Sequence, residues 1–196
     1  MDKLLLGALI IVILNSCVAT QNSYVSNNNQ EKFWTQLNSL CGKAFKGKVV
    51  SAPANDTVFR NKDLWLHVRS CEAGTIRIPF TVGTDRSRTF ILSRQKNSIS
   101  FNHDHRHADG SEDSLTMYGG VTSNSGSANV QFFPAHQHTV NILPAAAGNV
   151  WWIEIDPGTS LRYNLRRLGT DRIFTVEFDL TTEVDPPPAP WGWMDK

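Results

Sequence analysis

Apolar side chains recur at every second position in a series of short segments, which is the pattern of strands with one buried face. The segments are 64–68, 76–82, 90–92, 99–101, 151–155, 161–165 and 174–180. Turn signals separate several of them, as at Gln95-Lys96-Asn97 and Asp156-Pro157-Gly158. The pattern predicts roughly eight to ten short strands.

A different pattern appears once, near the N-terminus. Phe33, Trp34, Leu37 and Leu40 follow three- and four-residue spacing, which predicts a helix over 31–40 that Gly42 could end. No helical pattern lies between the later strands, which argues against alternating strands and helices. We therefore predict an all-β fold, a single antiparallel β-barrel. A short helix before a long meander resembles the calycin, lipocalin-like arrangement. A cupin-like barrel or a β-sandwich is the alternative.

Pro79 interrupts one predicted strand and indicates a sheet edge or a bulge at that point.

The N-terminus has the composition of an export signal. A short apolar run from Leu4 to Leu14 is typical of a signal peptide, which we assign to 1–16. The sequence around Cys17 resembles the bacterial lipobox and predicts lipidation of Cys17. Cleavage near Ala19 or Thr20, and retention of the run as an anchor, are the alternatives. All three place the domain outside the cytoplasm, in the bacterial cell envelope or secreted. In the lipidated form that we prefer, the lipid anchor is the only link to a membrane.

The remaining boundaries follow from composition. Residues 17–30 are polar and are predicted to form a flexible tether, and residues 31–182 to form the barrel domain. Residues 183–196 are rich in proline and tryptophan. We expect a loose tail there, the alternative being an arm that packs its tryptophans on the barrel or on a partner.

Charge and cysteines narrow the setting. The formal net charge is +1 and no basic block is present, so nucleic-acid binding has no electrostatic support. Cys41 and Cys71 are predicted to pair in an oxidising compartment, and such a disulfide would contribute ~3 kcal/mol. Two separate buried thiols are the alternative.

Histidines and acidic residues are most concentrated in the segment 103–113. His103, His105 and His107 share the parity of Ile99 and Phe101, so on a strand they would extend an apolar row toward the interior. Asp104 and Arg106 have the opposite parity and are expected on the outer face. Neutral imidazoles bind zinc and similar ions, so the row predicts a metal or ligand site.

Other residues could complete that site. A second His-x-His stands at His136 and His138, and the two pairs could meet across the sheet. Glu112, or the acids Asp109 and Asp113, could complete the shell of a divalent transition metal. The alternative is a solvated strand end, since Asp109-Gly110 is a strong turn signal. The spacing of His105, His107, Glu112 and Gly119 also resembles the later part of the first cupin motif.

Arginines form a third feature. Most are expected to face outward, Arg162 and Arg166 among them, although some could line an interior and hold an anionic ligand. Asp85-Arg86-Ser87-Arg88 is expected to form a charged turn.

Three strings carry a family resemblance: Ile76 to Phe90, the His-rich segment 103–113, and Thr116 to Gly120. Over Leu40 to Leu180 the chain resembles a group of secreted or lipid-anchored bacterial proteins of small all-β domains. That group has no established activity, so the resemblance implies only the extracytoplasmic bacterial setting.

These observations predict an extracytoplasmic binding protein for a metal ion or small ligand. A metal-dependent enzyme, cupin-like or hydrolytic, is the first alternative, and a structural envelope lipoprotein without a ligand is the second. The histidines in themselves do not decide whether the protein is an enzyme.

Overall fold

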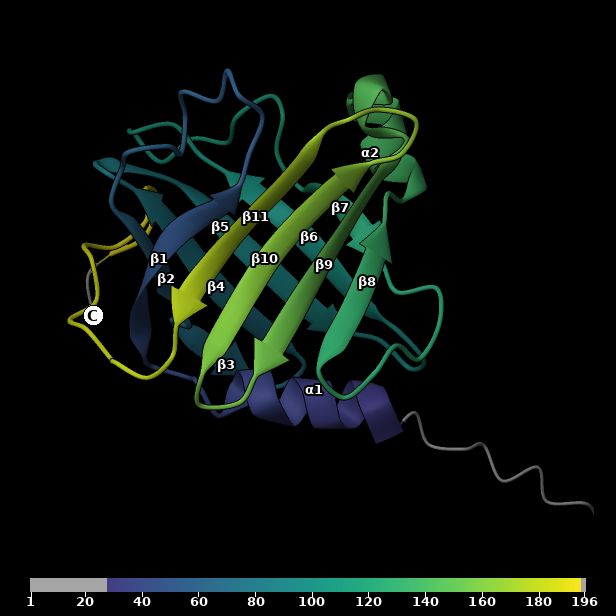
Figure 1. Cartoon of the computed structure of the whole chain (residues 1–196), viewed down its shortest axis with the longest axis horizontal. Helices are drawn as coiled ribbons and strands as arrows, with labels where there is room; N and C mark the ends of the chain where they lie inside the picture. The colour runs from purple at the N-terminus through teal and green to yellow at the C-terminus, as the bar shows by residue number, and fades with distance from the viewer. Residues whose placement is uncertain (1–27, 195–196) are drawn as a thin grey trace, which may run out of the picture.

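A computed structural model describes residues 28–194, so the predicted signal peptide, Cys17 and most of the tether lie outside the described residues. The chain folds as one nearly closed antiparallel barrel (Figure 1). The prediction of an all-β barrel with a short N-terminal helix is confirmed. No helix in the described range is long and apolar enough to cross a membrane.

The strands follow one path around the barrel, in the order β7-β6-β5-β4-β2-β1-β11-β10-β9-β8, with β3 paired to β4. Their bounds are β1 Ala44–Ser51, β2 Leu64–His67, β3 Ser70–Glu72, β4 Thr75–Val82, β5 Asp85–Arg94, β6 Ile99–His105, β7 Tyr118–Val121, β8 Val130–Pro134, β9 Asn149–Asp156, β10 Ser160–Arg167 and β11 Ile173–Asp179. The helices are α1 Asn28–Asn38 and α2 Gln137–Ile142, with a short 3-10 turn, η1 Pro144–Ala146.

The barrel closes at two glycines. Gly120 of β7 forms an isolated bridge with Ala135, just after β8. A Cβ atom on Gly120 would lie 2.3 Å from the carbonyl oxygen of Pro134, and one on Gly119 would overlap the backbone of Phe101 in β6. Both positions therefore need glycine for the close approach of neighbouring strands.

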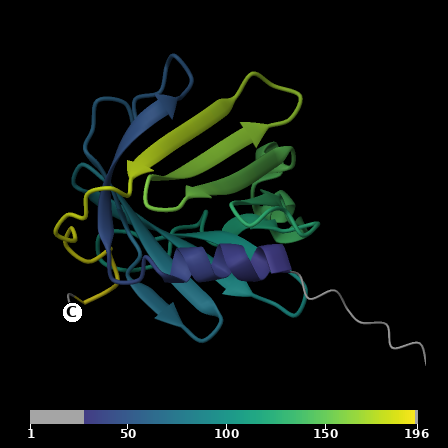
Figure 2. The same cartoon turned by 60° about the horizontal axis from the view of Figure 1, so that its bottom comes forward.

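α1 closes one end of the barrel (Figure 2). Phe33 and Leu37 are fully buried in the core, as their spacing predicts. Gln30 donates to the Thr122 hydroxyl at 2.9 Å, and Glu31 pairs with Arg94 at the end of β5. A disulfide joins Cys41, just after the helix, to Cys71 in β3, which ties this end of the barrel together.

Pro79 belongs to β4, which has neighbouring strands on both sides, so it does not lie at an edge of the sheet. On one side it pairs with Thr89 of β5. On the other side it lies opposite the interruption between β2 and β3, because Phe80 pairs with Leu66 and Arg77 with Ser70. Proline has no backbone N–H to donate, and Pro79 stands where the hydrogen-bond ladder of the sheet is already interrupted. This is consistent with the predicted irregularity.

The tail is not loose over its described part, which corrects the expectation from composition. Ala189 is buried, and its carbonyl oxygen accepts a hydrogen bond from Arg86 Nη1 at 2.9 Å. The Trp191 N–H donates to the Arg86 carbonyl at 3.1 Å, and Gly192 packs against Gly110. The tail thus packs against the start of β5 and the turn that follows β6. The segment Asp85–Arg88, which was expected to form a charged turn, is instead the start of strand β5.

Candidate functional site

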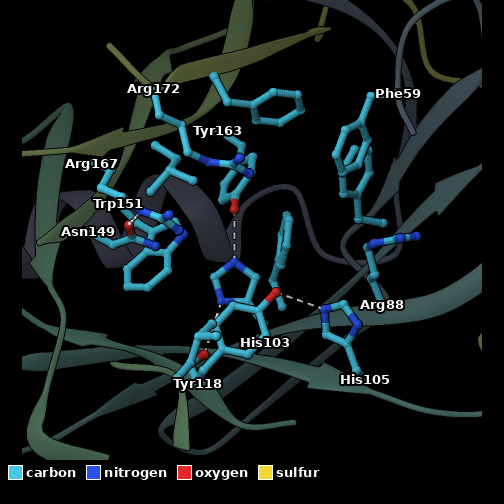
Figure 3. Close-up of a pocket in the computed structure, with 15 residues that line it drawn as sticks. Phe59, Arg88, His103, His105, Tyr118, Asn149, Trp151, Tyr163, Arg167 and Arg172 are labelled. Atoms are coloured by element: carbon cyan, nitrogen blue, oxygen red, sulfur yellow. Dashed lines mark hydrogen bonds between the residues drawn. The ribbon is translucent and has the colours of Figure 1, made fainter. Parts of the chain in front are cut away.

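A cavity of about 150 Å³ lies inside the barrel at the end opposite α1 (Figure 3). A volume of this size can hold a single six-membered ring. Its wall is largely aromatic, built from Phe59, Phe80, Phe90, Trp151, Tyr163 and Phe174. Phe59 comes from the 52–63 loop, and its ring packs 4.6 Å from that of Phe174.

Three arginines also line this cavity, and each one extends an inward-facing apolar row. At steps of two residues, Arg88 is followed by Phe90 and Leu92, and Arg172 is followed by Phe174 and Val176. At the same spacing, Arg167 comes after Leu161, Tyr163 and Leu165. Because parity sets the face on a strand, Arg88 and Arg167, which are partly buried, point inward. Arg172 lies one residue before β11, is exposed, and borders the cavity at its mouth. Figure 3 shows Arg167 and Arg172 on one side of the cavity and Arg88 on the other.

The arginines differ in their partners. Arg88 Nη1 lies 2.5 Å from Asp85 Oδ2 in a part-buried ion pair. Arg167 donates through Nε to Asn149 Oδ1 at 2.9 Å, which orients the guanidinium. Within residues 28–194, neither Arg167 nor Arg172 has a carboxylate within ion-pair distance. The cavity therefore carries uncompensated positive charge.

His103 forms the deep end of the cavity and is 3% exposed. Its Nδ1 lies 3.1 Å from the carbonyl oxygen of Tyr118, which can only accept, so Nδ1 carries the proton. Its Nε2 lies 2.9 Å from the Tyr163 hydroxyl, which therefore donates to it. Burial lowers the pKa of His103 to about 3, and burial also raises the pKa of Tyr163 well above its ordinary value. Both side chains are neutral at physiological pH.

His105 and Tyr118 form a second pair nearer the mouth. The Tyr118 hydroxyl lies 3.0 Å from His105 Nε2, and the Tyr118 ring stacks on His103 with centroids 4.6 Å apart. Burial, and next the charge of Arg88, lower the pKa of His105. Burial raises the pKa of Tyr118 to about 12. This pair is also uncharged at physiological pH.

The structure brings together only part of the predicted histidine-acid cluster. His103 and His105 face the interior beside Ile99 and Phe101, which confirms the parity argument. His107 is exposed in the turn after β6, and Glu112 is exposed and pairs with Arg106. Asp109 and Asp113 accept hydrogen bonds from the backbone of their own turn.

The second His-x-His does not reach the first. His136 caps α2, accepting from the Thr139 N–H through Nδ1, and its Nε2 lies 2.9 Å from Asn102 Oδ1. His138 is exposed on the helix. Among residues 28–194, no group of three or more histidine, cysteine, aspartate or glutamate side chains is arranged to hold a metal ion. In the described residues, the side chains expected to bind a divalent transition metal do not come together, and metal binding stays a prediction.

Asp104 is on the outer face, as its parity predicts, but it is not solvated. Its side chain is 3% exposed and pairs with Arg106 Nε at 3.1 Å. The Thr116 hydroxyl also donates to it, at 3.2 Å, and the same Thr116 oxygen accepts from the His105 N–H. This cluster fixes the strand end that carries His105.

Five cavity residues were not expected there from the sequence: Arg88, Tyr118, Tyr163, Arg167 and Arg172. The signal was nevertheless present, because each arginine has the parity of its apolar row. An arginine next to a row of apolar residues is usually assigned to a strand end in water, and that assumption hid the convergence of three strand ends. Tyr118 lies in a short glycine-rich strand with no alternation to read.

No known protein family, curated protein or solved structure matches this chain, so the site stands on its own geometry.

Proposed function

We propose that the protein binds a small organic anion, a carboxylate with a ring-sized apolar body, in the open end of the barrel. The observation that carries this proposal is the pair Arg167 and Arg172, which lacks a carboxylate partner within residues 28–194 and borders an aromatic cavity. Guanidinium groups hold carboxylates through paired hydrogen bonds. The aromatic wall would cover the apolar part of the ligand.

The surroundings favour an anion over a cation. Among residues 28–194, no carboxylate lines the cavity, and the nearby Asp85 is engaged with Arg88, so nothing there is free to hold a positive group. His103, His105, Tyr118 and Tyr163 add no negative charge because their pKa shifts keep them neutral. A metal ion would meet positive charge and occupied nitrogen atoms.

The proposed setting is the bacterial envelope or the cell exterior, where the disulfide between Cys41 and Cys71 would persist. The proposed role is capture of the anion without catalysis, because the Tyr118 and Tyr163 hydroxyls, although they lie beside His105 and His103, have raised pKa values and stay protonated.

Calorimetric titration with benzoate tests this function. For a ligand of this size we expect a Kd on the order of 0.1 mM at low ionic strength. Arg167→Gln and Arg172→Gln should each weaken binding about 10- to 100-fold, the value of a hydrogen bond to a charged group. Benzamide, the uncharged isostere, should bind at least about tenfold more weakly than benzoate.

Arg162→Gln is the matched control. Arg162 lies on the same strand as Arg167 but faces outward, where it pairs with Glu177 and Glu154. Its substitution should leave the benzoate Kd unchanged. Equal binding of benzoate and benzamide, or equal losses in Arg162→Gln and Arg167→Gln, would show that the cavity does not select anions.

A further inference from the structure

The two sides of the cavity differ in charge. On the β10–β11 side, Arg167 and Arg172 have no carboxylate partner in residues 28–194. On the opposite side, the charge of Arg88 is balanced by Asp85 at 2.5 Å. A ligand that complements both sides would therefore carry its acidic group at one end only.

The polar group on the second side is the Tyr118–His105 pair. Its single hydrogen bond, 3.0 Å long, can be made in two ways. Tyr118 can donate to Nε2 while His105 carries its proton on Nδ1, or Nε2–H can donate to the Tyr118 oxygen and leave the hydroxyl proton free. The pair can thus offer either a donor or an acceptor without acquiring charge.

The deeper pair lacks this freedom. His103 Nδ1 donates to the Tyr118 carbonyl, so its Nε2 must accept and the Tyr163 proton is committed to it. The Trp151 indole also contacts the Tyr163 hydroxyl. His103 and Tyr163 therefore satisfy each other and leave no spare hydroxyl proton or free Nε2 for a ligand.

The group that matches an uncharged site able to donate and accept is a hydroxyl, which itself does both. A second carboxylate would meet an uncompensated desolvation cost there, and a purely apolar end would leave the pair without a partner. The space between the two sides is lined by aromatic rings and holds about one ring.

We propose that the ligand is a hydroxylated ring acid, with its carboxylate on Arg167 and Arg172 and its hydroxyl on Tyr118 and His105. This inference rests on the proposed anion-binding function and names the class of ligand that the same site takes.

A series of benzoates tests the proposal by calorimetric titration: benzoate, 3- and 4-hydroxybenzoate, 3- and 4-chlorobenzoate, and terephthalate. One hydroxybenzoate isomer should bind about five- to tenfold more tightly than benzoate, the effect of one neutral hydrogen bond. The chlorobenzoates, which match the hydroxyl in position but form no such bond, should lack this gain. Terephthalate, with its second carboxylate, should bind more weakly than that hydroxybenzoate.

Tyr118→Phe should reduce the hydroxybenzoate preference, the ratio of the benzoate Kd to the hydroxybenzoate Kd in the same variant, to less than about twofold. His105→Gln, at a half-buried position, is the second variant; its amide keeps a donor and an acceptor and should retain part of the preference.

Three results would overturn the inference: no preference for a hydroxybenzoate, tightest binding of terephthalate, or an unchanged preference in both variants. If benzoate still binds and needs Arg167 in these cases, the anion-binding function stands and only the ligand class is wrong. Absence of all benzoate binding would reject the function itself.

Discussion

His103 shows how burial sets the chemistry of a single residue in this cavity. The imidazole is neutral because burial lowers its pKa to about 3, and its two hydrogen bonds fix which nitrogen carries the proton. The tautomer in turn commits the Tyr163 proton. The only adaptable hydrogen bond that remains among these four side chains is the one between Tyr118 and His105.

The lowered pKa of His103 has a consequence for stability. In the unfolded chain a histidine titrates near 6.5, so below that pH the unfolded state binds a proton that the folded state excludes until about pH 3. Stability is therefore full above pH 6.5 and is lost as the pH falls toward 3. We expect His103 to account for about 2 kcal/mol of the loss between pH 7 and pH 5.

Urea unfolding at the two pH values measures this loss. His103→Gln has no titrating ring and should lose about 2 kcal/mol less than the wild type over this interval. His138→Gln, at an exposed position on α2, is the control and should behave as the wild type does. The ring signals of His103 in NMR spectra should also stay constant between pH 7 and pH 5; a full titration of those signals in this range would contradict the assignment.

At the residue scale, sequence parity was sufficient for part of the site. It places His103 and His105 inside because Ile99 and Phe101 already define the inner face. It could not show that His107, two residues further, lies in a turn, because the strand ends at His105. Nor could parity show that His136 caps α2, because that contact depends on a short helix without a clear sequence pattern.

The strands supply the site by ending at the same place. The rows of β5, β10 and β11 are apolar along the barrel core, and each has an arginine near or just beyond its end away from α1. Alternation along one strand is local and can be read from sequence. Which strand ends become neighbours depends on strand order and register, and the alternation along single strands reveals neither.

The seam between β7 and β8 depends on the close approach of backbone atoms at Gly120. Gly120→Ala would place a methyl group 2.3 Å from the Pro134 carbonyl oxygen and 2.4 Å from that of Phe133. Because these are backbone atoms, the seam must open, and we expect a loss of about 1–3 kcal/mol or more in the free energy of unfolding.

Gly148→Ala is the matched control, since its Cβ would come no closer than 3.1 Å to a neighbouring atom. It should cost clearly less in the same urea-unfolding measurement. Equal losses for the two substitutions would mean that the barrel does not depend on the close approach at Gly120.

Over the whole molecule, the barrel has one closed and one open end (Figure 1). α1 fills the first with Phe33 and Leu37, and the cavity occupies the second. Strand periodicity and the single helical segment were enough to predict this architecture, because both are local patterns. The packed tail was not predictable in the same way, because its anchor, the Arg86 backbone and side chain, lies far away in sequence.

We propose that the arginines at the open end form an anion site inside the barrel. NMR mapping of benzoate binding on the labelled wild-type protein tests this proposal. We expect saturable shifts in the guanidinium signals of Arg167 and Arg172 and in the ring signals of Tyr163 and Phe174. Shifts confined to the outer-face groove around Lys46, Lys48 and Arg162, or no saturable shifts, would contradict it.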